Sequence, residues 1–460
     1  MDAPHSDALV FFGATGDLAH KKIFPALQAM VKHGHLSAPI IGVAHDDWDL
    51  DRLKARARDG LEKHGGVDEA AFAKLCGLLR YVDGDYKDAA TFQALRKELG
   101  DARHPSHYLA IPPVLFGTVV EQLGRSGCAE GARVIVEKPF GHDLESAKAL
   151  NAILLSVFDE KSIFRIDHYL GKRPVQNLRY FRFANSFLEP IWNRDHVSDV
   201  QIIMAEAIGI EGRGAFYDKT GAIRDVIQNH MLQILAYLTM EPPAGRDSES
   251  IQDAKSNLIR QVRSIDPRNV VRGQFVGYHE EPGVAADSQT ETFAALRLEI
   301  DSPRWRDVPF FVRAGKRLPV SCIEVVVNLR PSKSSRNFNS PKSNYLRFRI
   351  SPEASIALGV MTLASGEEMT GDEVELLACH HPNGDEMGAY ERLLGEAMKG
   401  ERGLFAREDY VEEEWRVVDP ILGSAAPLYE YEPDTWGPVE AERIVAEVDR
   451  WHDPKASGCD

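Results

Sequence analysis

The stretch that decides the fold is Ala8-Leu9-Val10-Phe11-Phe12-Gly13-Ala14-Thr15-Gly16-Asp17-Leu18-Ala19. Its continuous apolar run, residues 8–12, predicts a strand buried on both faces of a parallel sheet. A strand, a glycine turn and a helix in succession are typical of dinucleotide binding. Gly13 permits the tight turn, and Gly16 lets backbone N–H groups approach a pyrophosphate. The spacing G-x-x-G-x-x-A is a variant, so a tight turn that binds no ligand remains the alternative.

Strands and helices go on alternating after this turn. Further buried strands are expected at residues 40–44, 80–82, 108–111 and 133–136, with helical patterns between them and a helix from Asp143 to about Phe158. This alternation predicts a doubly wound, Rossmann-type parallel sheet that binds its ligand beyond the carboxyl ends of the strands. We expect one domain over residues 1–166 and a second over 167–460.

The second part of the chain has a different pattern. A strand near 200–207 and an amphipathic helix over 220–240 precede a series of strands at 294–300, 310–313, 324–329, 346–350, 356–361 and 374–377. Because successive strands lack helices between them, we expect an α+β domain: one large, mostly antiparallel sheet with helices on one side.

Composition limits the classes of partner. The 460 residues include 54 Lys+Arg and 70 Asp+Glu, for a net charge of −16. Nucleic acid or an anionic membrane is therefore not an expected partner. No apolar run reaches the ~20 residues of a membrane helix, and no signal peptide is apparent. The five cysteines lack paired spacing, which favours a reduced, cytoplasmic chain without structural zinc. The residues from about Pro454 are expected to fray.

The residues that follow the second strand bear on the choice of cofactor. They are His45-Asp46-Asp47, where an acid favours NAD and an Arg would bind the 2′-phosphate of NADP. This favours NAD or dual use, although a protonated His45 could donate to a phosphate. A solvated loop histidine is the alternative.

Three other segments concentrate reactive side chains. The segment 165–172 combines an acid, an imidazole, a phenol and an ammonium, and is either a ligand site or a hydrogen-bonded joint. Lys138 closes the fifth strand, where it could bridge cofactor and substrate or pair with Glu137 at the surface; its bond to Pro139 could be cis. His230 lies on or beside the apolar stripe of the helix 220–240, where a core histidine is the usual outcome.

Together these stretches resemble the glucose-6-phosphate dehydrogenase family of the bacterial type. The matching segments are residues 13–19 with Lys21-Lys22, Glu137-Lys138-Pro139-Phe140-Gly141, residues 165–172, Glu211-Gly212-Arg213-Gly214, residues 223–230 and Arg313-Ala314-Gly315-Lys316. The family oxidises C1 of β-D-glucose 6-phosphate to 6-phospho-D-glucono-1,5-lactone with NADP or NAD, the first oxidative step of the pentose phosphate pathway. No metal is expected. The resemblance also implies a substrate-binding and dimerisation role for residues 167–460, and a homodimer or homotetramer.

The resemblance implies roles for individual residues. His230 matches the general base, and Asp167 the carboxylate that orients it. The substrate contacts it implies are Lys22, Lys138, His168, Tyr169, Lys172, Glu206, Asp225 and Lys316, and the cofactor contacts are Gly13, Ala14, Thr15, Gly16, Asp17, Leu18, His45, Asp85, Tyr86 and Lys138.

Three positions depart from the family pattern. His45 replaces the Arg that usually binds the 2′-phosphate, Arg173 replaces a common Glu, and Ser321 stands where relatives are often basic. Two other functions remain open. One is a related two-domain sugar oxidoreductase that uses Lys138 as its proton carrier, and the other is a sugar-phosphate or dinucleotide sensor without activity.

Overall fold

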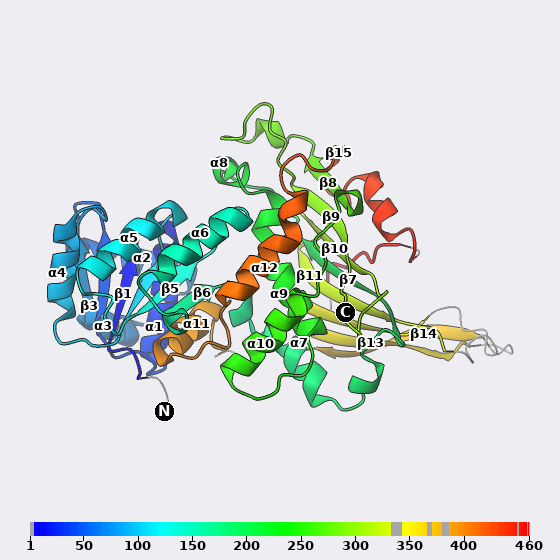
Figure 1. The fold of residues 1–460 in the computed structure, drawn as a ribbon, viewed down its shortest axis with the longest axis horizontal. Coiled ribbons are helices and arrows are strands. Elements are labelled where there is room, and N and C mark those ends of the chain that lie inside the picture. Colours follow the sequence, from blue (N-terminus) through cyan, green and yellow to red (C-terminus); the bar gives the residue numbers. More distant parts are fainter. Residues whose placement is uncertain are drawn as a thin grey trace. The chain divides into compact units, whose positions relative to one another are not determined.

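The computed structural model describes residues 4–332, 343–365, 370–379, 386–448, 450–457 and 459. The chain divides into two compact units (Figure 1). Unit 1 comprises residues 1–173, 243–253 and 385–412, and unit 2 comprises 174–242, 254–384 and 413–460. Within the described residues, no helix has the length and apolar character needed to span a membrane.

Unit 1 is built on a six-stranded, wholly parallel sheet in the order β3-β2-β1-β4-β5-β6. The strands are β1 (Ala8–Phe12), β2 (Ile40–Ala44), β3 (Leu79–Asp83), β4 (Pro105–Leu109), β5 (Arg133–Glu137) and β6 (Ile163–Ile166). The doubly wound sheet expected from the sequence is confirmed. β4 begins three residues earlier than expected, and β6 was not anticipated. Because the strands are parallel, all of their carboxyl ends lie at one edge.

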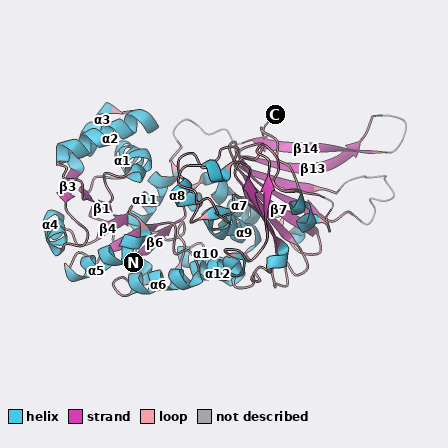
Figure 2. Cartoon of the chain, turned by 90° about the horizontal axis from the view of Figure 1, so that it is seen from above, coloured by secondary structure: helices cyan, strands magenta, loops and turns pink. Residues whose placement is uncertain are grey.

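Helices cover both faces of this sheet. The helices α1 (Phe24–Lys32), α2 (Leu50–His64) and α3 (Glu69–Leu78) lie on one face, and α5 (Phe116–Arg125) and α6 (Leu144–Leu155) on the other (Figure 2). A further helix, α4 (Ala89–Leu99), follows β3. Asp143 caps α6 as expected, since its carboxylate accepts a hydrogen bond from the amide of Ser146. A late segment, α11 (Ala389–Lys399), packs against α1.

Unit 2 is built on a nine-stranded sheet in the order β14-β13-β12-β11-β7-β10-β9-β8-β15. The strands are β7 (Val197–Ala205), β8 (Val270–Phe275), β9 (Phe293–Leu298), β10 (Phe310–Gly315), β11 (Cys322–Leu329), β12 (Tyr345–Ser351), β13 (Ser355–Leu363), β14 (Gly371–Cys379) and β15 (Leu428–Tyr431). Only the β7–β10 and β8–β15 pairs are parallel, so the expected, mostly antiparallel sheet is confirmed. β8 and β15 were not anticipated.

The helix expected over residues 220–240 is present, but its first half is not α-helical. A π-helical segment, η6 (Ile223–Met231), leads directly into α9 (Leu232–Thr239), and α9 lies against one face of the sheet (Figure 1). π-Helical turns are rare and are frequent at functional sites. The change of helix type alters which of the side chains in residues 223–231 lie one turn apart.

The carboxyl-terminal segment corrects two expectations. Of the residues expected to fray, Lys455 and Ala456 are held in place instead, because the guanidinium of Arg349 donates hydrogen bonds to their carbonyls at 2.7 and 3.1 Å. The expectation that every cysteine is reduced is wrong for two of the five, since Cys379 and Cys459 form a disulfide. Paired spacing in the sequence could not reveal this bond, because 80 positions separate the two residues.

Candidate active site

The glycine turn lies at the carboxyl edge of the unit 1 sheet. Gly13 has a φ of +80°, and a Cβ atom there would lie 2.3 Å from the carbonyl oxygen of Ala110. Only glycine fits this position without strain. The amide of Gly16 closes the turn onto the carbonyl of Gly13 at 3.0 Å, which leaves Gly16 and Asp17 exposed. A tight, uncovered turn between a buried strand and a helical segment fits a dinucleotide pyrophosphate.

Tyr86 joins this turn although it is distant in sequence. Its hydroxyl accepts a hydrogen bond from the amide of Gly13 at 2.9 Å and donates one to the carbonyl of Val43 at 3.1 Å. Burial raises the pKa of Tyr86 to about 12, so its hydroxyl remains protonated at neutral pH. Its neighbour Asp85 is exposed and caps the turn that follows, accepting a hydrogen bond from the amide of Lys87.

The end of β2 presents the residues expected to read the ribose. His45 is exposed, and Asp46 accepts a hydrogen bond from the hydroxyl of Thr15 in the glycine turn. The acid is therefore placed beside the turn, as a residue that contacts the adenosine ribose must be. Lys22 is also exposed, on the helical segment η1 (Ala19–Ile23).

Glu137, at the end of β5, is buried rather than paired at the surface. The hydroxyl of Tyr108 donates a 2.6 Å hydrogen bond to its carboxylate, and Tyr390 on α11 also hydrogen-bonds to it. Burial raises the pKa of Glu137 to about 7, although these hydrogen bonds and the charge of Lys138 lower it. The next residue, Lys138, is half-buried and is joined to Pro139 by a cis peptide bond.

The segment 167–172 follows β6 at the same edge of the sheet. Asp167 is buried and caps the short helix η4 (His168–Gly171), accepting a hydrogen bond from the amide of Tyr169 at 3.0 Å. The ammonium of Lys172 lies 3.6 Å from the centre of the Tyr169 ring. Gly171 is required here, because a Cβ atom would lie 2.8 Å from the carbonyl oxygen of Ala389. The segment is thus a partly buried, hydrogen-bonded structure that presents two cationic or titratable side chains, His168 and Lys172.

In unit 2, Lys316 brings two carboxylates together. It follows β10 and forms an ion pair with Glu206, which follows β7; its ammonium also lies 3.8 Å from a carboxylate oxygen of Asp225 on η6. Its ammonium is 5.5 Å from the centre of the Tyr217 ring. Because β7 and β10 are adjacent and parallel, their carboxyl ends deliver Glu206 and Lys316 to one place. Such a cluster can hold the hydroxyl groups of a sugar.

His230 lies in the same π-helical segment as Asp225 and is 2% exposed. Its backbone amide donates a hydrogen bond to the side-chain oxygen of Asn229 at 2.7 Å. Its neighbours Gln228, Asn229 and Met231 are buried as well, so burial alone does not place His230 on an apolar stripe. Ser321, one of the positions that depart from the family pattern, accepts a hydrogen bond from the amide of Ala207 at 2.9 Å.

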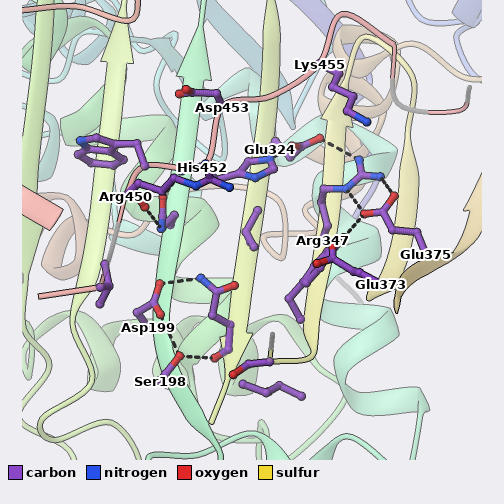
Figure 3. A pocket seen from close by; sticks show the side chains of 18 of the residues that line it. Ser198, Asp199, Glu324, Arg347, Glu373, Glu375, Arg450, His452, Asp453 and Lys455 are labelled. Carbon is purple, nitrogen blue, oxygen red and sulfur yellow. Dashed lines mark hydrogen bonds and ion pairs between the residues drawn. The ribbon is translucent and has the colours of Figure 1, made fainter. Parts of the chain in front are cut away.

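A cavity of about 960 Å³ lies elsewhere on the large sheet, against β7, β11 and β12 (Figure 3). Its centre is an ionic cluster: the carboxylate of Glu324 lies 3.1 Å from the guanidinium of Arg347 and 2.6 Å from the imidazole of His452. The described residues that line it include none of those expected to bind sugar or cofactor.

The structure therefore groups the expected residues within each unit. The glycine turn, His45, Tyr86, Lys138 and the segment 167–172 belong to unit 1, and Glu206, Asp225, His230 and Lys316 belong to unit 2. Sequence reasoning missed Tyr108 and Tyr390, the two phenols that hold Glu137. Tyr108 lies in a buried strand and could have been noticed as a polar group that needs a partner, whereas nothing in the sequence around Tyr390 signals its contact.

A Rossmann-type sheet with an uncovered glycine turn, in one chain with a mixed sheet and the segment η6 that together carry acid, lysine and histidine side chains, is the arrangement of a two-domain, dinucleotide-binding oxidoreductase. Comparison with known proteins gives the family. Residues 10–177 match the NAD binding domain of glucose-6-phosphate dehydrogenase, and residues 179–452 match its C-terminal domain. The chain belongs to the glucose-6-phosphate dehydrogenase family.

Individual relatives match over nearly the whole chain. Glucose-6-phosphate 1-dehydrogenase 1 of Mycobacterium bovis is 43% identical over 453 residues, which cover 98% of this chain and 97% of the relative. The crystal structure of glucose-6-phosphate 1-dehydrogenase from Mycobacterium avium is 46% identical, with a TM-score of 0.93 over 99% of this chain and all of the other. A glucose-6-phosphate dehydrogenase in complex with its substrate glucose 6-phosphate is 32% identical, with a TM-score of 0.89 and coverage of 99% and 100%.

Proposed function

We propose that this protein oxidises C1 of β-D-glucose 6-phosphate to 6-phospho-D-glucono-1,5-lactone and transfers the hydride to a nicotinamide dinucleotide. The observation that carries this proposal is the match to both domains of the family over residues 10–452, together with a similar solved structure that holds the sugar phosphate. The chain has a net charge of −16, which disfavours an anionic ligand overall. The lysine and histidine side chains of the candidate site provide local positive charge and hydrogen-bond donors for a sugar phosphate and a dinucleotide.

The sugar phosphate is bound through its far end and its hydroxyl groups. We assign the phosphate to His168, Tyr169 and Lys172, because Lys172 is a compact cation suited to phosphate. The cluster of Glu206, Asp225 and Lys316 would receive the sugar hydroxyl groups, with Lys138 and Lys22 between sugar and nicotinamide. Binding energy from these contacts, remote from C1, would hold C1 in position for reaction.

The reaction at C1 requires the loss of a hydride and of the hydroxyl proton. We assign the proton to the imidazole of His230, because histidine exchanges protons near neutral pH and a positioned general base contributes roughly 10²–10⁴-fold in rate. Asp167 would hold the other ring nitrogen and stabilise the imidazolium. The products are the lactone, one reduced nicotinamide dinucleotide and one proton.

We propose that the enzyme accepts NAD as well as NADP, bound through Gly13, Ala14, Thr15, Gly16, Asp17 and Leu18 with Asp85 and Tyr86. The support is the exposed His45 and the placement of Asp46 beside the glycine turn, because a carboxylate accepts hydrogen bonds from the ribose and repels a 2′-phosphate.

We also propose that the protein forms a homodimer or homotetramer through its large sheet. β14 is the end strand of that sheet, and it leaves apolar side chains uncovered: Leu376 is 59% exposed, Val374 39% and Leu377 38%. An apolar end strand is prone to pair with another chain. Light scattering on the wild type and on Leu376→Lys checks this: the mass of the variant should fall if the strand lies in the interface, and an unchanged mass excludes it.

We further propose that the chain consists of two domains, residues 1–166 and 167–460. We also propose a cytoplasmic location. The disulfide between Cys379 and Cys459 counts against this location, because disulfides are rare in the cytosol.

The activity is tested with the purified full-length chain. The absorbance of reduced nicotinamide is followed with glucose 6-phosphate or unphosphorylated glucose, each with NAD and with NADP. We expect nicotinamide to be reduced only with glucose 6-phosphate, or at a far higher rate with glucose 6-phosphate than with glucose. No reduced cofactor with either nucleotide would favour a sensor, and equal rates with glucose would favour the alternative sugar oxidoreductase.

A further inference from the structure

Two histidines and one glutamate of unit 1 converge at a place that the proposed reaction does not use. His33 and His35 follow α1, and Glu391 lies in the first turn of α11; His33 and Glu391 are 358 positions apart in sequence. Their side-chain nitrogen and oxygen atoms all lie within 4.8 Å of one another. We propose that His33, His35 and Glu391 bind a divalent transition-metal ion, Zn²⁺ in the first instance.

The backbone fixes the two imidazoles before any ion binds. The amide of His35 donates to the carbonyl of Met30 at 2.8 Å, and the amide of Gly34 donates to that of Val31 at 3.2 Å. Gly34 has a φ of +76°, so the turn is a glycine-terminated helix end of the Schellman type. It points two histidines from one turn towards a single helix.

Glu391 needs a positive partner. Its side chain is only 3% exposed, and a buried carboxylate is costly unless it is paired. One carboxylate oxygen lies 2.6 Å from Nδ1 of His33 and 3.5 Å from Nδ1 of His35. Neutral imidazoles provide hydrogen bonds but no charge, and the guanidinium of Arg392 is a positive charge near Glu391. A cation bound between the two imidazoles and the carboxylate would add a second positive charge in direct contact with Glu391.

The distances suit a metal ion after a small adjustment. With ligands at 2.0–2.2 Å, two ligand atoms of a tetrahedral zinc ion lie roughly 3.4 Å apart. The separation between His35 and Glu391 is 3.5 Å, whereas the 2.6 Å separation between His33 and Glu391 would have to lengthen. The imidazoles are 24% and 41% exposed, which leaves room for a water as the fourth ligand. Two imidazoles and one carboxylate form a recognised zinc ligand set.

The ion would fix a turn that supports the candidate active site. Within the first turn of α11, Tyr390 hydrogen-bonds to Glu137, and Arg392 donates to the carbonyl of Gly171 at 2.7 Å. Glu391 lies between these two residues. An ion held by Glu391 and the turn after α1 would therefore tie α11 to α1. It would also stabilise the contacts that Tyr390 and Arg392 of α11 make with Glu137 and Gly171.

The test uses the untagged, full-length protein after treatment with a chelator, in a mildly alkaline buffer and again in a mildly acidic one. Zn²⁺ is titrated against a chromophoric chelator, and the melting temperature is measured with and without Zn²⁺. We expect one tight equivalent and a higher melting temperature. Glu391→Gln, which keeps the shape of the side chain, and His35→Ala should each weaken binding by at least roughly 10- to 100-fold, the loss typical of residues that only support a metal ligand.

His279→Ala, which removes an exposed histidine of unit 2, is the matched control and should bind as the wild type does. The melting temperatures in chelator show that each variant folds. The proposal is overturned if Glu391→Gln and His35→Ala retain wild-type affinity. It is also overturned if Zn²⁺ leaves the wild type unchanged and only acid stabilises it, which would make the cluster a proton-linked ion pair. No readout depends on turnover, so failure of this proposal is distinct from failure of the proposed reaction.

Discussion

The hydroxyl of Tyr108 donates a 2.6 Å hydrogen bond to the buried carboxylate of Glu137, one residue before Lys138. Burial dominates the balance and raises the pKa of Glu137 to about 7, and the nearby charge of Asp167 contributes in the same direction. The carboxylate that precedes the lysine assigned to the sugar and nicotinamide therefore titrates near neutral pH.

This shift predicts a pH-dependent stability. In the unfolded chain Glu137 titrates near its ordinary pKa of 4.5, so between 4.5 and about 7 the folded protein retains a proton that the unfolded chain has lost. The free energy of unfolding contributed by this group therefore falls as the pH rises through that window. Glu137→Gln should remove this contribution. As the pH rises through the window, the free energy of unfolding of the variant should therefore increase relative to that of the wild type by a few kcal/mol, the size that corresponds to the pKa shift. Denaturant unfolding at several pH values measures this, and parallel curves for the two proteins would contradict it.

Lys316 is the cation of the unit 2 cluster, paired with Glu206 and near Asp225. Lys316→Ala leaves two carboxylates together without a cation and, on the assignment proposed above, removes a donor to the sugar. We expect KM for glucose 6-phosphate to rise roughly tenfold or more, the range for losing a charged hydrogen bond. Steady-state kinetics measure this, with Lys219→Ala at an exposed position as the control. An unchanged KM in Lys316→Ala would remove Lys316 from the substrate site.

His45 decides cofactor preference in this account. His45→Arg adds a permanent guanidinium that can pair with the 2′-phosphate, so kcat/KM should shift towards NADP relative to NAD. The ratio of kcat/KM for the two nucleotides, measured side by side in variant and wild type, reports the shift. If that ratio is the same in both proteins, another residue makes the choice.

The disulfide between Cys379 and Cys459 ties the end of the chain to β14. Cys459→Ser should lower the free energy of unfolding by about 2–4 kcal/mol, a typical value for a disulfide that closes a long loop. Reduction of the wild type by a dithiol should have the same effect and should not affect the variant further. Cys76→Ser, which changes a free cysteine, is the control. Peptide mapping without reductant must find the two cysteines linked, and their absence as a linked pair would refute the bond.

The architecture was predictable from residue pattern because strand and helix periods are local properties. Residues 8–19 alone indicated the Rossmann-type sheet, and the strand series after residue 293 indicated the large antiparallel one. β15 was missed because it is a short edge strand with mixed polarity, Leu428–Tyr431. Contacts between residues distant in sequence could not be predicted. Tyr390 contacts Glu137 only because α11, late in the chain, belongs to unit 1.

The local geometry of the candidate site was less predictable than its composition. Residues 223–231 have a helical period that does not distinguish an α-helix from the π-helix observed, since both place apolar residues three to five positions apart. The buried state of Glu137 was also not evident, because an acid beside a lysine reads as a surface ion pair. Both features depend on packing between segments that are distant in sequence.

The central claim is that the imidazole of His230 takes the C1 hydroxyl proton. The most direct measurement is single-turnover and steady-state kinetics of His230→Asn, together with calorimetric binding of glucose 6-phosphate and the same measurements on His279→Asn. We predict that kcat of His230→Asn falls by roughly 10²–10⁴-fold while the affinity for glucose 6-phosphate stays within a few-fold of the wild type. A near-normal kcat in His230→Asn would contradict the account.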